Sequence, residues 1–197
     1  MKKLIFTFAA LLAVMATACS GDAKNKKNIN ESKIIVLVDE LRADAALYGA
    51  KSERESVTLP GIKVVSDNNL EFVSIGGIGI KLIKWGAKVS DDDDAKLAMA
   101  AFDGVKRLMV LDYENCDKAL KERFNKKIGR TLEGCELMME AKDEEETMSI
   151  YGTLSGDGSK ISDIVMYAPE SSALICFFGT IDTDELGKLV ETANKTE

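Results

Sequence analysis

The sequence predicts an α+β fold, in which helices pack on a largely antiparallel sheet that ends in a C-terminal four-stranded meander. One observation behind this prediction is a run of strand-like segments in the last third of the chain, separated by turn signals. The other is a set of earlier segments whose apolar residues recur at helical spacing. With 197 residues, 46% of them hydrophobic, the chain suits a single compact domain with a sizeable core.

The first predicted helix starts at Ser32 and ends at Gly49. Its apolar residues recur three and four positions apart, as on one face of a helix, and they are Ile34, Leu37, Val38, Leu41, Ala45 and Tyr48. Pro60-Gly61 then signals a turn, and a short extended stretch from Ile62 to Val65 follows it. The residues from Leu70 to Ile75 alternate in the manner of a strand.

Gly76 and Gly77 are expected to end this strand. A helix after them fits the spacing of the apolar residues Ile78, Leu82, Trp85 and Val89, but a strand fits as well, and both interpretations stay open. Ser90 and Asp93 match a capping box at the start of the next helix. The stripe that this helix would bury consists of Ala95, Ala98, Phe102 and Val105.

The unbroken apolar run from Leu108 to Leu111 predicts a strand covered on both faces. Asn115 or Asp117 can cap the next helix, and Gly134 is expected to stop it. The apolar residues of that helix lie four apart, at Leu120, Phe124, Ile128 and Leu132. The strands of the meander are predicted at Cys135 to Ala141, Thr147 to Leu154, Ile161 to Tyr167 and Ser172 to Ile181. A final helix is predicted after Thr183 or Asp182, either of which can cap it. Its inward-facing residues would be Leu186, Leu189, Val190 and Ala193.

The first residues of the chain are typical of a bacterial lipoprotein signal peptide, which we assign to residues 1–18. Lys2 and Lys3 precede an apolar segment, Leu4 to Ala16, that is too short to span a membrane. The segment Ala16-Thr17-Ala18-Cys19 then resembles a lipobox, the motif in which the cysteine receives a diacylglycerol before cleavage. Cys19 is therefore the predicted lipidation site, carrying palmitate-type chains. The alternative is an ordinary signal peptidase site that leaves Cys19 unmodified.

The sequence divides into a lipid-anchored cysteine with a flexible tether, residues 19–30, and one α+β domain, residues 31–197. Residues 20–30 are polar and cannot bury enough surface to become ordered, and such a tether reaches about 18 Å. The membrane is thus a predicted partner, through the N-terminal lipid. Ser20 is not the aspartate that retains lipoproteins in the inner membrane, so the outer membrane is favoured over the inner membrane.

The composition excludes several classes of function. A formal charge of −7 offers no electrostatic footprint for nucleic acid, and loss of Lys2 and Lys3 makes the charge more negative still. The chain contains no histidine, which removes Ser-His and Cys-His catalysis and imidazole metal ligation. We therefore expect no enzymatic activity, no catalytic residues and no cofactor.

Three local motifs are candidates for binding sites. The carboxylates Asp91, Asp92, Asp93 and Asp94 are weak candidates for calcium, because they lack the ligand spacing and the turn glycine of a calcium loop, and a helix start explains them better. The segments Gly76-Gly77-Ile78-Gly79 and Gly156-Asp157-Gly158-Ser159-Lys160 lack the spacing of phosphate-binding loops. We interpret the first as a strand-to-helix turn and the second as a hairpin turn. No metal site is predicted.

Three cysteines remain in the domain, Cys116, Cys135 and Cys176. Cys116 and Cys135 flank a helix of roughly 24 Å, which is too long for a disulfide between them. A bond between Cys135 and Cys176 is conceivable from their places on two strands. Buried thiols are favoured over it, because free cysteine commonly behaves as a small core residue.

From residue 59 to residue 190 the chain resembles a family of small envelope lipoproteins of Bacteroidetes, domain of unknown function 4252. The resemblance rests on the order of the elements, and the closest segments are Gly104 to Glu114, Glu136 to Lys142, Lys160 to Met166 and Gly179 to Leu186. It implies an envelope lipoprotein identity and carries over no catalytic or binding residue.

The favoured hypothesis is a lipid-anchored, non-catalytic module that binds an envelope protein or a small ligand. The first alternative is an envelope hydrolase with paired carboxylates, since the 33 acidic residues leave such pairs available. The second alternative is a purely structural lipoprotein of the envelope.

Overall fold

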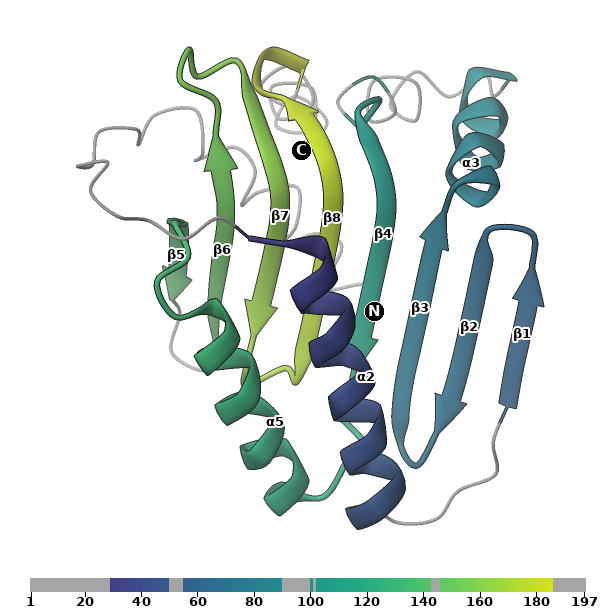
Figure 1. Ribbon diagram of the computed structural model, residues 1–197, viewed down its shortest axis with the longest axis vertical. Coiled ribbons are helices and arrows are strands. Elements are labelled where there is room, and N and C mark those ends of the chain that lie inside the picture. Colours follow the sequence, from purple (N-terminus) through teal and green to yellow (C-terminus); the bar gives the residue numbers. More distant parts are fainter. Residues whose placement is uncertain (1–28, 50–54, 90–99, 101, 143–145, 186–197) are drawn as a thin grey trace, which may run out of the picture.

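A single eight-stranded sheet organises the computed structural model, which describes residues 29–49, 55–89, 100, 102–142 and 146–185 (Figure 1). The strands are β1 (Glu55–Leu59), β2 (Ile62–Asp67), β3 (Leu70–Gly76), β4 (Val105–Asp112), β5 (Leu137–Lys142), β6 (Thr147–Leu154), β7 (Lys160–Ala168) and β8 (Ala173–Asp182). They lie in the order β1-β2-β3-β4-β8-β7-β6-β5. The described helices are α2 (Glu31–Tyr48), α3 (Ile78–Val89) and α5 (Lys118–Leu132).

Neighbouring strands pair antiparallel throughout the sheet. Strands β1, β2 and β3 form successive hairpins, and β5 to β8 follow one another in the same way. The two groups meet where β4 pairs with β8, in a register that sets Met109 opposite Cys176. The predicted α+β architecture with a largely antiparallel sheet and packed helices is confirmed.

Helices α2 and α5 lie side by side across one face of the sheet (Figure 1). Both are capped by short polar side chains, because Asn30 accepts a hydrogen bond from Ser32 N at 2.8 Å and Asp117 accepts one from Leu120 N at 2.9 Å. The predicted stripe of α5 is buried in full, and Phe124 sets its ring edge-on to Tyr113 with the centroids 5.4 Å apart.

Two apolar clusters lie on the two faces of the sheet. The cluster under α2 and α5 includes Phe72, Leu111 and Leu174, which occupy one row of cross-strand partners. The cluster on the opposite face includes Ile150, Ile164 and Met166. Strand β4 contributes to both faces, with Met109 and Leu111 buried on one side while Leu108 and Val110 are half-buried on the other.

Two details of the sequence prediction are wrong. Phe102 and Val105 were assigned to a helix, but Phe102 lies in a turn and Val105 begins β4, where Gly104 O accepts a hydrogen bond from Thr180 N at 3.1 Å. A side chain at Gly104 would overlap Thr180, because the backbone at Gly104 packs directly against β8. Tyr48 was placed in the buried stripe of α2, yet it is exposed.

The segment after Gly77 is a helix, which decides the question that the spacing left open. At the other end of the chain, Asp182 Oδ1 accepts hydrogen bonds from the backbone of Asp184 at 3.1 Å and of Glu185 at 3.2 Å, as a helix cap does. The residues expected to face inward from Leu186 onward lie outside the described part. Within that part, no helix combines the length and apolar character that crossing a membrane requires.

Candidate functional site

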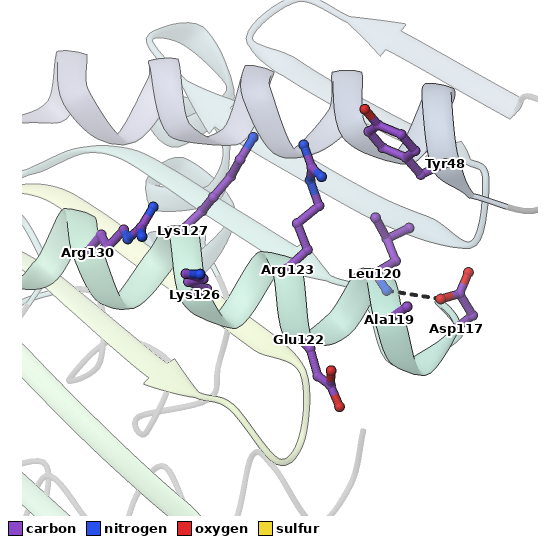
Figure 2. A pocket seen from close by; sticks show the side chains of 9 residues that line it. All are labelled: Tyr48, Asp117, Ala119, Leu120, Glu122, Arg123, Lys126, Lys127 and Arg130. Carbon is purple, nitrogen blue, oxygen red and sulfur yellow. Dashed lines mark hydrogen bonds between the residues drawn. The ribbon is translucent and has the colours of Figure 1, made fainter.

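A groove of about 650 Å³ runs along the solvent side of α2 and α5. Figure 2 shows the nine residues that line it, most of them from α5, with Tyr48 contributed by α2. The lining includes the apolar side chains of Ala119 and Leu120 and four cations. Two of the cations, Arg123 and Lys127, reach toward α2, and the other two, Lys126 and Arg130, form the exposed rim. Charge is therefore concentrated along one helix.

The groove is organised by Asp44, a carboxylate at a buried position of α2. Only 6% of this residue is exposed, because it lies on the face that α2 packs against the domain. Arg123 Nε lies 2.8 Å from Asp44 Oδ2, and Lys127 Nζ lies 2.6 Å from the same oxygen. Figure 2 shows both cations reaching from α5 toward α2. A carboxylate at such a depth requires cationic partners, and α5 supplies two of them.

The electrostatics of this cluster favour the charged forms of Asp44 and Arg123. Burial opposes ionisation of Asp44, but the hydrogen bonds from Arg123 and Lys127 outweigh it and hold the pKa of the carboxyl below its usual 3.8. The hydrogen bond to Asp44 likewise raises the pKa of Arg123 above its usual value. Both pKa shifts favour the charged form at neutral pH, so Asp44 and Arg123 serve as fixed charges rather than as groups that transfer protons.

Arg123 also contacts the ring of Tyr48. The guanidinium carbon lies 4.5 Å from the centroid of the Tyr48 ring, within the range of a cation–π contact. The exposure of Tyr48 thus has a role at the groove, since the ring restricts the conformations that Arg123 can adopt. Arg123 remains half-exposed, so one side of its guanidinium is accessible to a ligand.

The outer rim of the groove carries the side chains of Lys126 and Arg130, which are both exposed. Neither of them forms an ion pair within the described residues. Helix α5 carries a single acidic residue, Glu122, against the cations Lys118, Lys121, Arg123, Lys126, Lys127 and Arg130. In a chain of net charge −7, this helix is a local cationic surface.

Two carboxylates line the groove, Asp117 and Glu122. Asp117 is engaged as the N-cap of α5, and Figure 2 shows Glu122 pointing away from it on the other side of the helix. A hydrolase with paired carboxylates needs two acids that face one substrate across the site. This groove does not bring its two acids together in that way.

The glycine-containing segments predicted as turns are turns. Gly77 links β3 to α3 with φ of 53°, and the segment from Gly156 to Gly158 joins β6 to β7. Hydrogen bonds from Ser155 and Ser159 hold the exposed Asp157 carboxylate and lower its pKa to about 2. These bonds stabilise the hairpin.

The remaining predicted sites divide between described and undescribed residues. Cys19 and the run Asp91, Asp92, Asp93 and Asp94 lie outside the described residues. Among those that are described, no three metal-ligating side chains gather. Cys116 and Cys176 are buried thiols, as expected, and Cys135 Sγ donates to Thr131 O at 3.9 Å.

The groove itself was missed by the sequence analysis. Its two signals are an aspartate, Asp44, at the spacing of the buried stripe of α2, and the row of cations on α5. Asp44 and Arg123 are separated by 79 residues, so only the tertiary structure brings them together.

Comparison with known proteins gives one family. A family model described as "Domain of unknown function (DUF4252)" matches residues 65–189, which is more than half of the chain. The match contains α3, α5 and all of the sheet except β1 and the first residues of β2. No curated protein and no solved structure matches the chain significantly.

Proposed function

The chain belongs to the DUF4252 family, and we propose that it is a lipid-anchored, non-catalytic binding module of the cell envelope. The anchor part of the proposal rests on the order of a basic start, a short apolar segment and Ala16-Thr17-Ala18-Cys19. A diacylglycerol and a further acyl chain on Cys19 hold the domain permanently at the membrane, since two or more chains are needed for stable anchoring. Ser20 favours the outer membrane.

The binding part of the proposal assigns an anionic group of a ligand or partner to the groove between α2 and α5. The observation that carries it is that the four cations of the groove fall into two pairs with different surroundings. Asp44 fixes Arg123 and Lys127 in place, while Lys126 and Arg130 remain exposed on the rim. Cations held in place beside the apolar side chains of the groove favour binding of a carboxylate or phosphate group attached to a partly apolar molecule.

A binding titration tests the groove. The probes are inorganic phosphate and a short fluorescent polyglutamate peptide, added to the lipidated mature protein in a nonionic detergent. Replacement of both rim cations, Lys126→Glu with Arg130→Glu, is expected to weaken polyglutamate binding at least about tenfold, the equivalent of about 1.4 kcal/mol. Binding of the peptide alone indicates an acidic protein partner, whereas binding of phosphate as well indicates a phosphorylated ligand.

The matched control is Lys118→Glu with Lys121→Glu, which reverses two charges on the same helix at residues that do not line the groove. It changes the charge of α5 without changing the rim and should reduce binding much less than the rim variant. Equal losses in the two variants would mean that the helix attracts anions only through its overall charge. That result would count against the groove, and so would a lack of saturable binding of both probes by the wild-type protein.

A further inference from the structure

Helix α3 turns its apolar stripe away from the protein. Ile78, Leu82 and Trp85 lie four and three positions apart, on one face of the helix, and are 57%, 54% and 65% exposed. Ile83, which lies about 100° around the helix from Leu82, is also exposed. An amphipathic helix of a globular domain normally buries this stripe against the core. The orientation of α3 therefore needs a different explanation.

Contacts on the opposite side of α3 fix this orientation. Lys84 Nζ donates to the backbone oxygen of Asp103, lies 3.5 Å from its carboxylate, and lies 3.5 Å from Val105 O at the start of β4. Ile80, four residues earlier on the same side, is half-buried. The helix thus faces the domain with Ile80 and Lys84, and its apolar stripe faces solvent.

The hairpin of β1 and β2 is attached to the beginning of α3. A Cβ on Gly61 would overlap the backbone of Gly79, and Gly76 N donates to Gly61 O at 2.9 Å. Leu59, two residues before Gly61, and Val57 are 55% and 56% exposed on the edge strand. We call the exposed side chains of Val57, Leu59, Ile78, Leu82, Ile83 and Trp85 the α3 patch.

The N-terminal tether enters the domain at the end of the sheet where α3 begins. Glu31, the first residue of α2, pairs with Arg107 on β4 at 2.8 Å, and Arg107 lies opposite Gly76 in the sheet. Gly76 ends β3 just before α3 (Figure 1). The tether expected from the sequence between Cys19 and this point has a reach of about 18 Å. A lipid on Cys19 would therefore keep this end of the sheet next to the bilayer.

We propose that the α3 patch is a membrane-docking face, which lies in the interfacial region of the bilayer beside the lipid anchor. This inference rests on the proposed anchoring at Cys19. The chemistry of α3 suits the location, because the helix combines an exposed tryptophan and branched apolar side chains with the exposed Lys81 and has no acidic residue. Four aspartates follow α3 in the sequence, at 91–94, so the proposal assigns the binding to apolar contact rather than to charge.

Trp85 is the sole tryptophan of the chain, so its fluorescence reports on the patch alone. The experiment reconstitutes the lipidated mature protein into vesicles of equimolar phosphatidylcholine and phosphatidylglycerol, with and without brominated acyl chains. A docked patch gives a blue-shifted emission, quenching by the brominated lipid and protection from iodide in the water. Emission that stays red-shifted and sensitive to iodide overturns the docking proposal.

Co-sedimentation separates this proposal from the proposed anchor. Protein that sediments with the vesicles while Trp85 remains in water keeps the anchor and overturns the docking face. Protein that does not sediment overturns both. A blue shift without quenching by brominated lipid means that protein covers Trp85, as in a pair of chains, and also overturns membrane docking.

A double substitution gives the matched test. Ile78→Glu with Leu82→Glu is expected to abolish most of the quenching while the lipid still brings the protein down with the vesicles. Leu137→Glu, at a 47% exposed site on the far edge of the sheet, should leave the quenching unchanged. Circular dichroism checks that each variant is folded. Quenching that persists in the double variant would contradict the proposal.

Discussion

Arg123 of α5 places its Nε 2.8 Å from Oδ2 of Asp44 on α2, and this ion pair ties together the two helices that cover the sheet. Lys127 joins the same oxygen one turn later, so the seam between the helices contains a carboxylate with two cations. The groove depends on this arrangement, because it determines which cations of α5 face inward and which remain available to a ligand.

Replacing Asp44 should cost stability. Asp44→Ala leaves Arg123 and Lys127 without their acceptor, and we expect the free energy of unfolding to fall by about 1–3 kcal/mol, less than for a fully buried pair because both cations are partly exposed. Urea denaturation measures the change. Asp39→Ala is the control, since the exposed Asp39 lies 3.8 Å from Arg42 and should contribute little. Equal effects of the two substitutions would contradict the structural role of Asp44.

The same carboxylate predicts a pH dependence. The pKa of Asp44 in the folded protein lies below the unfolded value of 3.8, so its stabilising contribution is complete well above pH 3.8. It is lost as the pH falls through the folded-state pKa. Urea denaturation across this acidic range should show a loss of stability that is smaller in Asp44→Asn. An identical acid dependence in wild type and variant would argue against the shift.

Gly61 should not tolerate a side chain. Its φ is 78°, and an added Cβ would lie 2.5 Å from Gly76 O as well as against Gly79. We expect Gly61→Ala to destabilise the protein by about 1–3 kcal/mol and to disturb the contact between the hairpin and α3. Gly129→Ala, within α5 and with open space around it, should instead stabilise by about 0.5–1 kcal/mol. Thermal unfolding compares the two, and a tolerant Gly61 would contradict the observed close approach.

The buried thiols should be unreactive in the folded protein. Burial raises the pKa of Cys176, and burial together with the charge of Asp117 raises that of Cys116 to about 11. Because the thiolate is the reacting species, iodoacetamide at neutral pH should modify both residues only after unfolding. Cys135, which is half-buried, should react first. Mass spectrometry of the alkylated peptides gives the order, and fast native modification of Cys176 would refute its burial.

Local signals made helices α2 and α5 predictable. In α5 a capping aspartate, Asp117, precedes apolar residues four apart, and every part of that pattern lies within one segment. Strand β1 gave no comparable signal, because all of its side chains are exposed and no alternation of burial marks it. Val105 was misassigned because its place is decided by contact of Gly104 with Thr180, far along the chain.

The sites were harder to predict than the elements. The spacing of Ile78, Leu82 and Trp85 fits an amphipathic helix as well as a strand, and it does not say whether the apolar face turns inward. In α3 the answer comes from Lys84, whose partners at Asp103 and Val105 belong to another segment. The same holds for Asp44, which reads as an ordinary helix residue until α5 is placed beside it.

Mass spectrometry of the N-terminal peptide of the protein, isolated from its native membrane, is the most direct test of membrane anchoring. We expect a peptide that begins at Cys19 and carries a diacylglycerol and a further acyl chain. A peptide that begins at Cys19 without lipid, or one that still contains residues 1–18, would contradict the account.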